Sequence, residues 1–284
     1  MKTKNGLDKL ACSTLPVVVS IAGTDPSGGA GIQADLKAIS ATGSYAASII
    51  TVLVVQNTLS VSAIQEIPLT FIQQQIDAVF TDLPIGAVKL GMLYHTDIIQ
   101  LVAANLKKYR PPFVVLDPVM MSQTGQPLLK PEAIPALSNL FSLATLITPN
   151  IPEAEAIVKF NINNDQSMQA AATRLATDYK TSVLIKGGHL TTRHSPDIFY
   201  DYPHQQLHRF DALRLRTKNT HGTGCTLSAA IASYLAQGES LYNAITHAKY
   251  YLSQCLLAAK DLNLGHGQGP VHHFYFLDKK NFHN

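Results

Sequence analysis

Short runs of apolar, mostly β-branched residues recur along the chain, and stretches with helical spacing separate them. A continuous apolar run of this length predicts a strand that is buried on both faces, as in a parallel sheet. Six such runs are Pro16–Ala22, Ser48–Val55, Gly86–Leu90, Phe113–Leu116, Ala144–Thr148 and Ser182–Ile185.

The segments between these runs carry apolar residues three and four positions apart, which predicts helices. Four are Ile32–Thr42, Leu69–Asp82, Asp97–Tyr109 and Gln166–Tyr179. Gly43 is suited to cap the end of the first, and Asp165 to cap the start of the last. This alternation predicts an α/β fold, a doubly wound and mainly parallel central sheet with helices on both faces.

The pattern changes after the sixth run. Asp197–Leu215 has no helical period and predicts a polar, aromatic β-hairpin, and two helices follow at Thr223–Gln237 and Leu241–Lys260. No repeat or linker divides the chain, so we expect a tail at residues 1–14 and one domain at 15–284. The lysines before the first apolar run resemble the start of a signal peptide, but Pro16 and the glycine-rich loop that follows favour a buried strand.

Composition narrows the class of protein. Charged residues make up only 14% of the chain and the formal net charge is +3, with no dense basic cluster, so we expect no nucleic-acid partner. A surface with so few charges suggests a homodimer. The longest apolar run, Tyr45–Val55, is too short to span a membrane. Three widely spaced cysteines fit a reducing compartment, and we expect a cytoplasmic protein.

Ligands of such folds bind beyond the carboxyl ends of the strands. The polar residues that directly follow the apolar runs are therefore the candidates for a site. They are Gly23-Thr-Asp25, Gln56-Asn57, Gly91-Met92, Asp117, Asn150 and Lys186-Gly-Gly-His189.

The most informative segment is Asn219-Thr-His-Gly-Thr-Gly-Cys-Thr-Leu-Ser-Ala-Ala230, a glycine-rich turn that opens an apolar helix. The N–H groups and the positive end of the helix dipole then face the turn, which suits a phosphate. Gly222 and Gly224 allow close approach, and Cys225 lies in the first turn. A plain glycine turn with an inert buried cysteine is the alternative.

A second glycine-rich segment, Gly23–Asp35, follows the first strand. It does not spell G-x-G-x-x-G, and Gln56 stands where a dinucleotide-binding protein needs an acidic residue. The chain also has no Gly-Lys-Ser/Thr, so neither a Rossmann dehydrogenase nor a Walker A loop is indicated.

Oxygen ligands for a hard cation follow two neighbouring strands. Asp117, Asn150 and Glu153 suit Mg²⁺ held through water, although Asn150 to Glu153 can equally be an ordinary helix start. Lys186 is placed to reach a phosphate, or is a solvated surface lysine. The pair His204 and His208 lies too far apart on a strand, without an acidic partner, to predict a metal site.

Taken in order, these segments resemble the hydroxymethylpyrimidine/phosphomethylpyrimidine kinases of thiamine synthesis, which belong to the ribokinase-like superfamily. The resemblance covers roughly residues 16–272. The segments that carry it are Gly23–Asp35, Val54–Asn57, Lys89–Leu93, Leu116–Met120, Thr148–Glu153, Lys186–His189 and Thr220–Cys225.

The resemblance implies an enzyme that uses ATP and Mg²⁺ to phosphorylate 4-amino-5-hydroxymethyl-2-methylpyrimidine and then its monophosphate. It implies that Asp35 and Gln56 read the polar groups of the pyrimidine. The residues implied around the ring are Gly23, Ala30, Asp35, Val54, Gln56, Met92 and Val119. Those implied for ATP are Asp117, Asn150, Glu153 and Lys186, with Asp117 and Glu153 serving Mg²⁺. Those implied for the anion hole and the base are Gly222, Thr223, Gly224 and Cys225.

A helix N-terminus lowers the pKa of a thiol, so we expect Cys225 to be partly thiolate and to accept the proton of the substrate hydroxyl. The sequence departs from the family at Pro26, at Met121-Ser-Gln-Thr and at Gly265-His-Gly-Gln-Gly-Pro270, which has one extra residue. Two alternatives stay open, a pyridoxal kinase of the same superfamily and a non-catalytic vitamin sensor.

Overall fold

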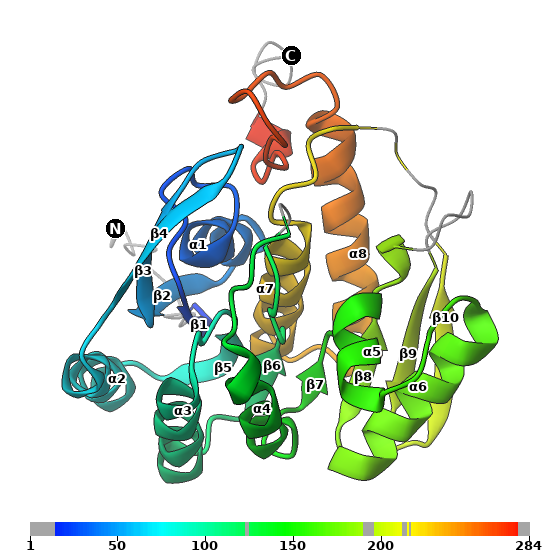
Figure 1. The fold of residues 1–284 in the computed structure, drawn as a ribbon, viewed down its shortest axis with the longest axis horizontal. Helices are drawn as coiled ribbons and strands as arrows, with labels where there is room; N and C mark the ends of the chain where they lie inside the picture. Colours follow the sequence, from blue (N-terminus) through cyan, green and yellow to red (C-terminus); the bar gives the residue numbers. More distant parts are fainter. Residues whose placement is uncertain (1–14, 123–124, 190–195, 212–214, 216, 278–284) are drawn as a thin grey trace, which may run out of the picture.

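Eight strands form one sheet through the middle of the molecule (Figure 1). In the order in which they lie side by side, they are β10 (Gln206–Phe210), β9 (Asp197–Asp201), β8 (Ser182–Ile185), β7 (Leu146–Ile147), β6 (Phe113–Leu116), β5 (Ile85–Leu90), β1 (Val17–Ala22) and β2 (Tyr45–Ile50). All neighbouring pairs from β8 to β2 are parallel, and the pairs β8–β9 and β9–β10 are antiparallel. The structure is a computed structural model that describes residues 15–122, 125–189, 196–211, 215 and 217–277.

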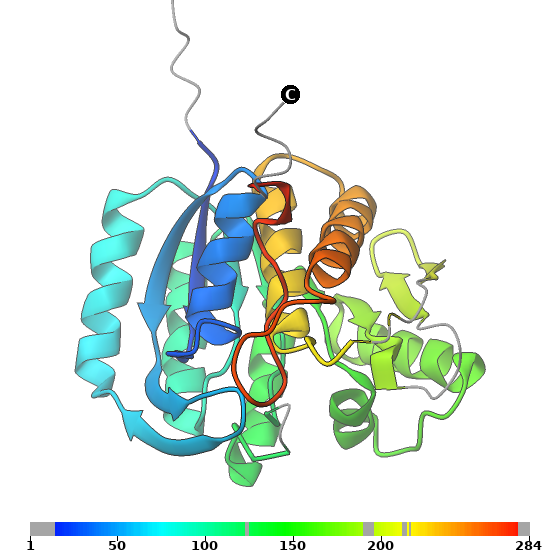
Figure 2. The same ribbon diagram turned by 90° about the horizontal axis from the view of Figure 1, so that it is seen from above.

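Helices cover both faces of the sheet (Figure 2). On one face, a buried apolar core joins the sheet to five helices: α2 (Leu69–Asp82), α3 (Thr96–Tyr109), α4 (Ile134–Phe141), α5 (Ile151–Val158) and α6 (Asp165–Tyr179). On the other face, a second core joins it to α1 (Gly31–Ala41), α7 (Thr223–Ala236) and α8 (Leu241–Ala258). Three short 3₁₀ turns lie at Pro131–Ala133, Gly187–His189 and Tyr275–Leu277. The predicted doubly wound, mainly parallel fold is confirmed.

The run predicted as one strand at 48–55 is two strands in different sheets. β2 ends before Thr51, which is fully buried and donates its hydroxyl to the Met92 carbonyl at 2.8 Å. The chain then forms β3 (Val52–Gln56), which pairs antiparallel with β4 (Val61–Glu66) in a separate ribbon. Side chains alternate between buried and exposed along β3, but the exposed Leu53 and Val55 are apolar as well. That apolar exposed face hid the period of two in the sequence.

Other boundaries agree or shift by a few residues. The helix predicted at Leu69–Asp82 has those bounds, and the predicted hairpin at 197–215 contains β9 and β10. Residues 212–214 of that hairpin and the predicted tail at 1–14 lie outside the described residues. The capping residue of α6 is Asn164 rather than Asp165, because the Asn164 side chain accepts the Ser167 N–H. No helix within the described ranges has both the length and the apolar character that a membrane crossing requires.

Candidate active site

A cavity of about 610 Å³ opens at the carboxyl ends of the parallel strands, where the sequence analysis placed the site. Of the residues that the family resemblance implies for the site, all except Asp35 line its wall. They come from the loop after β1 (Gly23, Ala30), from β3 (Val54, Gln56), from the loops after β5 to β8 (Met92, Asp117, Val119, Asn150, Lys186), from the first turn of α5 (Glu153) and from the start of α7 (Gly222, Thr223, Gly224, Cys225). The other strand-end candidates Asn57, Gly91 and Gly187–His189 do not line it.

The turn before α7 has a shape that only glycine permits. Gly222 is the N-cap with φ +77°, and a Cβ there would lie 1.8 Å from the Gly29 carbonyl oxygen. A Cβ on Gly224 would lie 3.2 Å from Lys186 Nζ and 3.3 Å from Asp117 Oδ2. The N–H groups of a first helical turn have no acceptor inside the helix, so this turn offers donors beside a lysine, and the lack of side chains at Gly222 and Gly224 leaves its backbone exposed to the cavity. These are the features of a phosphate-binding turn.

Lys186 and Asp117 form an ion pair on the cavity wall, with Nζ 2.7 Å from Oδ1. The Lys186 side chain is only 15% exposed, so it is not a solvated surface lysine. Burial alone would lower the pKa of Lys186, but Asp117 and Glu153 raise it above its ordinary value. The ammonium group therefore stays charged at neutral pH, as a phosphate partner must.

Asn150 and Glu153 form a capping box at the start of α5. The Glu153 N–H donates to Asn150 Oδ1 at 2.9 Å, and the Asn150 N–H donates to Glu153 Oε2 at 2.8 Å. The helix-start alternative is thus correct, yet both side chains also line the cavity. Burial raises the pKa of Glu153 to about 7, and the nearby Asp117 carboxylate adds to that rise while Lys186 opposes it.

The two carboxylates of Asp117 and Glu153 fit a Mg²⁺ ion held partly through water and phosphate oxygens, which is how proteins usually bind this cation. A cation at these carboxylates would neutralise the negative charge that Lys186, through its ion pair with Asp117, balances only in part. Among the described residues, no cluster of three or more His, Cys, Asp or Glu side chains is arranged to hold a metal ion.

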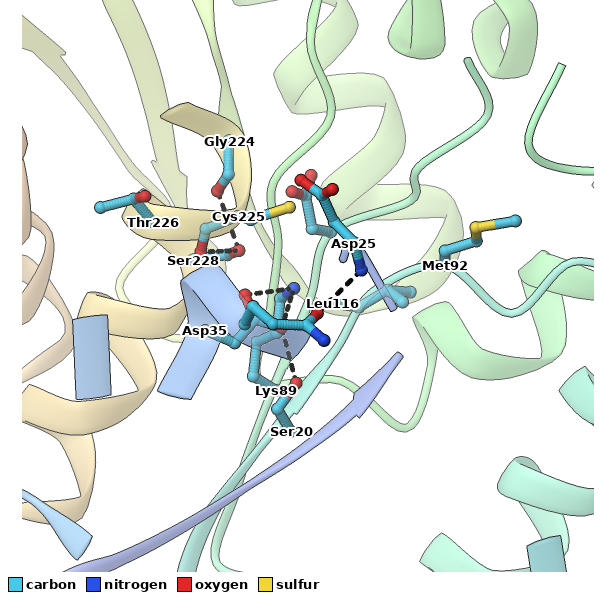
Figure 3. A network of polar contacts seen from close by, with 12 residues as sticks. Ser20, Asp25, Asp35, Lys89, Met92, Leu116, Gly224, Cys225, Thr226 and Ser228 are labelled. Carbon is cyan, nitrogen blue, oxygen red and sulfur yellow. Dashed lines mark hydrogen bonds and ion pairs between the residues drawn. The ribbon is translucent and has the colours of Figure 1, made fainter. Parts of the chain in front are cut away.

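Cys225 lies in the first turn of α7 and lines the cavity (Figure 3). Burial raises the pKa of its thiol to about 11, and Asp35 and Asp117 raise it further, whereas Lys89 and the Gly31 N–H lower it. This raised pKa contradicts the prediction that Cys225 is partly thiolate. Desolvation of the sulfur outweighs the favourable helix N-terminus.

Asp35 lies behind the cavity wall rather than on it. Lys89 Nζ donates to both carboxylate oxygens of Asp35, at 2.9 Å to Oδ1 and 2.7 Å to Oδ2, and the Ser20 hydroxyl donates to Oδ2 at 2.6 Å (Figure 3). Both ionic side chains are fully buried. Burial raises the pKa of Asp35, whereas for Lys89 the effect of burial is outweighed by Asp35, which raises its pKa. The prediction that Asp35 touches the ring does not match this placement, and the carboxylate instead holds Lys89 beside Cys225.

Apolar side chains and one amide make the wall nearest β3. A Cβ on Gly23 would lie 3.0 Å from Val52 Cγ2 and 3.1 Å from Met92 Sδ, so the wall is closely packed there. Gln56 Nε2 lies 3.2 Å from His221 Nε2, and that same ring nitrogen lies 2.8 Å from Asp25 Oδ2.

Two residues of the wall were missed as functional in the sequence. Lys89 interrupts a run that is otherwise apolar, and a cation inside a buried strand was a usable signal. His221 lies inside the glycine-rich turn and carried no separate signal. Its partner Asp25 is 196 residues away in sequence.

Comparison with known proteins gives a consistent picture. The family model described as phosphomethylpyrimidine kinase matches residues 25–272. The hydroxymethylpyrimidine/phosphomethylpyrimidine kinase of Escherichia coli is 47% identical over 259 residues, which cover 90% of this chain and 97% of that protein.

Two further relatives extend the comparison. A thiamine biosynthesis bifunctional protein of Geobacter sulfurreducens is 48% identical over 257 residues, which are 90% of this chain and about half, 52%, of that longer protein. The structure of Bacillus subtilis pyridoxal kinase in complex with ADP has a TM-score of 0.84 and 33% identity, and the match covers 92% of this chain and 98% of that one.

Proposed function

The chain belongs to the phosphomethylpyrimidine kinase family, and on that premise we propose that it transfers the terminal phosphate of ATP to the hydroxymethyl group of 4-amino-5-hydroxymethyl-2-methylpyrimidine. The resulting monophosphate is phosphorylated in turn to the diphosphate, for the synthesis of thiamine diphosphate. The Geobacter relative's name refers to thiamine biosynthesis, and the Bacillus neighbour is solved with ADP, which supports ATP as the donor.

One observation carries the proposal. The same cavity is lined on one side by the apolar side chains of Val54 and Met92 with the amide of Gln56, and elsewhere by the phosphate-binding turn at Gly222–Cys225. The first suits a flat ring with polar edges, and the second suits a transferring phosphate. The ring's hydroxymethyl group can therefore point at the phosphate.

In the reaction, the hydroxyl oxygen attacks the γ-phosphorus while the bond to the β–γ bridging oxygen breaks, and the hydroxyl loses its proton. Positioning and charge stabilisation do most of the work in such transfers. Lys186 and the N–H groups at the start of α7 would stabilise charge on the γ-phosphoryl oxygens. Cys225 is the proposed base, but with a thiol pKa of about 11 it must first lose its own proton. The positive charge of Lys89 and the Gly31 N–H favour this loss.

Asp117, Asn150 and Glu153 are the residues that we propose to hold Mg²⁺, through water. When bound, the ion would neutralise charge on the phosphates of ATP.

The test is an ATP-consumption assay with purified protein, Mg²⁺ and one of three acceptors: hydroxymethylpyrimidine, its monophosphate and pyridoxal. We expect the highest kcat/KM with the pyrimidine. The likeness to a pyridoxal kinase makes that activity the second candidate. A higher kcat/KM for pyridoxal would replace the substrate assignment, and no phosphorylation of any of the three would favour a vitamin sensor.

We also propose a homodimer in the cytoplasm. β2 is the edge strand of the large sheet, and the adjacent β3–β4 ribbon exposes Leu53, Val55 and Leu59, so a second copy could cover this apolar surface. Cys225 and Cys255 are free thiols, which suits a reducing compartment. Sedimentation of the purified protein tests the dimer.

A further inference from the structure

Hydrogen bonds to both oxygens fix the orientation of the Asp25 carboxylate. Oδ1 accepts the N–H of Ser27 at 2.9 Å and its hydroxyl at 2.7 Å, while Oδ2 accepts the N–H groups of Gly29 at 3.1 Å and Ala30 at 2.7 Å. The side chain is 2% exposed. Burial alone would raise the pKa of Asp25, but the hydrogen bonds from His221 and Ser27 bring it below its ordinary value. Asp25 is therefore an ionised group that can only accept hydrogen bonds.

That fact determines which nitrogen of His221 carries a hydrogen. Nε2 lies 2.8 Å from Asp25 Oδ2, and a bare lone pair facing a carboxylate at that distance would be repelled. His221 must therefore present Nε2–H to Asp25. A ring nitrogen that already carries its hydrogen cannot accept one from Gln56.

Gln56 can now take only one amide orientation. With Nε2 placed 3.2 Å from His221 Nε2, two donors would face each other. A half-turn of the amide, which leaves its outline unchanged, puts Oε1 there instead, where it can share the His221 hydrogen in a three-centre bond. The NH₂ group then takes the place of Oε1, away from His221, on a side chain that lines the cavity.

We propose that the Asp25–His221 pair is a specificity device that locks Gln56 as a hydrogen-bond donor toward the substrate. Gln56 accordingly contacts a ring nitrogen of the aminopyrimidine, which is an acceptor, and another group must meet the exocyclic amino group. Asp25 and His221 are positioning residues, because they act through Gln56 and need not touch the ring. The inference rests on the proposed function, since it assumes that the pyrimidine occupies this cavity.

The first test uses Gln56→Glu, which keeps an acceptor for His221 but removes the donor toward the cavity. We expect the KM for hydroxymethylpyrimidine to rise about tenfold or more, as for the loss of one buried hydrogen bond, with the KM for ATP unchanged. Gln65→Glu, on the neighbouring strand β4 with an exposed side chain, is the matched control and should behave as wild type. Gln56→Met should show the same loss as Gln56→Glu.

The second test is a double-mutant cycle between His221→Phe and Gln56→Met. His221→Phe should raise the KM for hydroxymethylpyrimidine about tenfold in the otherwise wild-type protein and by less than twofold when Gln56 is already Met. A merely structural role of His221 would give the same rise in both backgrounds, and that outcome would overturn the proposal.

The third test uses two pyridine analogues of the substrate, each with one ring nitrogen replaced by CH. One of them should bind about tenfold more weakly than the parent to the wild-type protein and show no such difference with Gln56→Met. If both analogues bind like the parent, or if Gln56→Glu has a normal KM, the donor orientation is wrong. Turnover of hydroxymethylpyrimidine by the wild type is measured separately, so a failure of the proposed function is distinguishable from a failure of this inference.

Discussion

The Lys89–Asp35 pair under the cavity allows a prediction whose magnitude follows from its geometry. Both side chains are fully buried, and Nζ makes two contacts with the carboxylate, at 2.9 and 2.7 Å. Among the described residues, Lys89 is the only cation in contact with the Asp35 carboxylate, and Lys89→Met leaves that buried carboxylate with the Ser20 hydroxyl as its one remaining partner. Breaking a buried pair from one side costs about 3–5 kcal/mol, so we expect the urea midpoint to fall by on the order of 1 M.

Removal of both charges should be much less harmful. In Lys89→Met/Asp35→Leu neither partner of this pair remains as an unpaired buried charge, and only the Ser20 hydroxyl loses its acceptor, which costs about 1–3 kcal/mol. The double variant should therefore recover part of the stability that the single variant loses. Lys108→Met is the matched control, because its ion pair with Asp77 is exposed, and we expect it to leave the urea midpoint nearly unchanged.

The pH dependence of the single variant gives an independent check. Burial raises the pKa of Asp35, and the loss of Lys89 raises it further, so the folded state binds a proton that the unfolded state releases. The stability of the variant then falls as the pH rises from the ordinary pKa of an aspartate to the raised pKa of Asp35, and it recovers as the pH is lowered. Urea unfolding of Lys89→Met at pH 5 and pH 8 measures the effect. A wild-type urea midpoint for Lys89→Met, or a double variant less stable than the single one, would refute this reasoning.

Three further predictions concern the site. Cys225→Ala should keep the fold and lower turnover by about 10²–10⁴-fold, the usual contribution of a positioned base, and near-normal turnover would mean that the thiol only packs. Because burial raises the pKa of Cys225 to about 11, alkylation of this residue by iodoacetamide should still be increasing with pH at pH 9, as followed by mass spectrometry; a plateau by pH 8 would contradict that pKa. Glu153→Gln should raise the Mg²⁺ concentration needed for half-maximal rate, whereas Glu132→Gln, at an exposed position, should not. In the wild type, that Mg²⁺ concentration should rise as the pH falls below about 7, because Glu153 becomes protonated there. A Mg²⁺ requirement that does not change with pH would remove Glu153 from the metal site.

The C-terminal glycine segment explains one departure of the sequence from its family. The Gln268 N–H donates to the Thr58 carbonyl in the β3–β4 turn, and the Gly269 carbonyl accepts the His221 N–H. A Cβ on Gly267 would lie 2.0 Å from the Thr58 oxygen. The extra residue of Gly265–Pro270 is thus accommodated in a segment that joins the ribbon to the turn before α7.

The sequence alone determined the architecture and the position of the site. Apolar runs and helical periods are local properties of the chain, so they predicted the parallel strands, the hairpin at β9–β10 and the helix at Leu69–Asp82 within a few residues. Polar residues after those runs had to meet at one edge, because parallel strands share the direction in which they end. That rule placed Met92, Asp117 and Lys186 on one cavity without any knowledge of contacts, whereas Gln56 reaches the cavity from the separate β3–β4 ribbon.

Only the tertiary structure decided the chemistry of each group in the cavity. The pKa of Cys225 depends on how much water reaches the sulfur and on the charges of Asp35, Lys89 and Asp117, which come from three different elements. The amide orientation of Gln56 depends on His221, 165 residues away, and His221 depends on Asp25. Burial and long-range contact set these properties, and neither is encoded in the spacing of residues along the chain, so the sequence could locate the site but could not assign its protons.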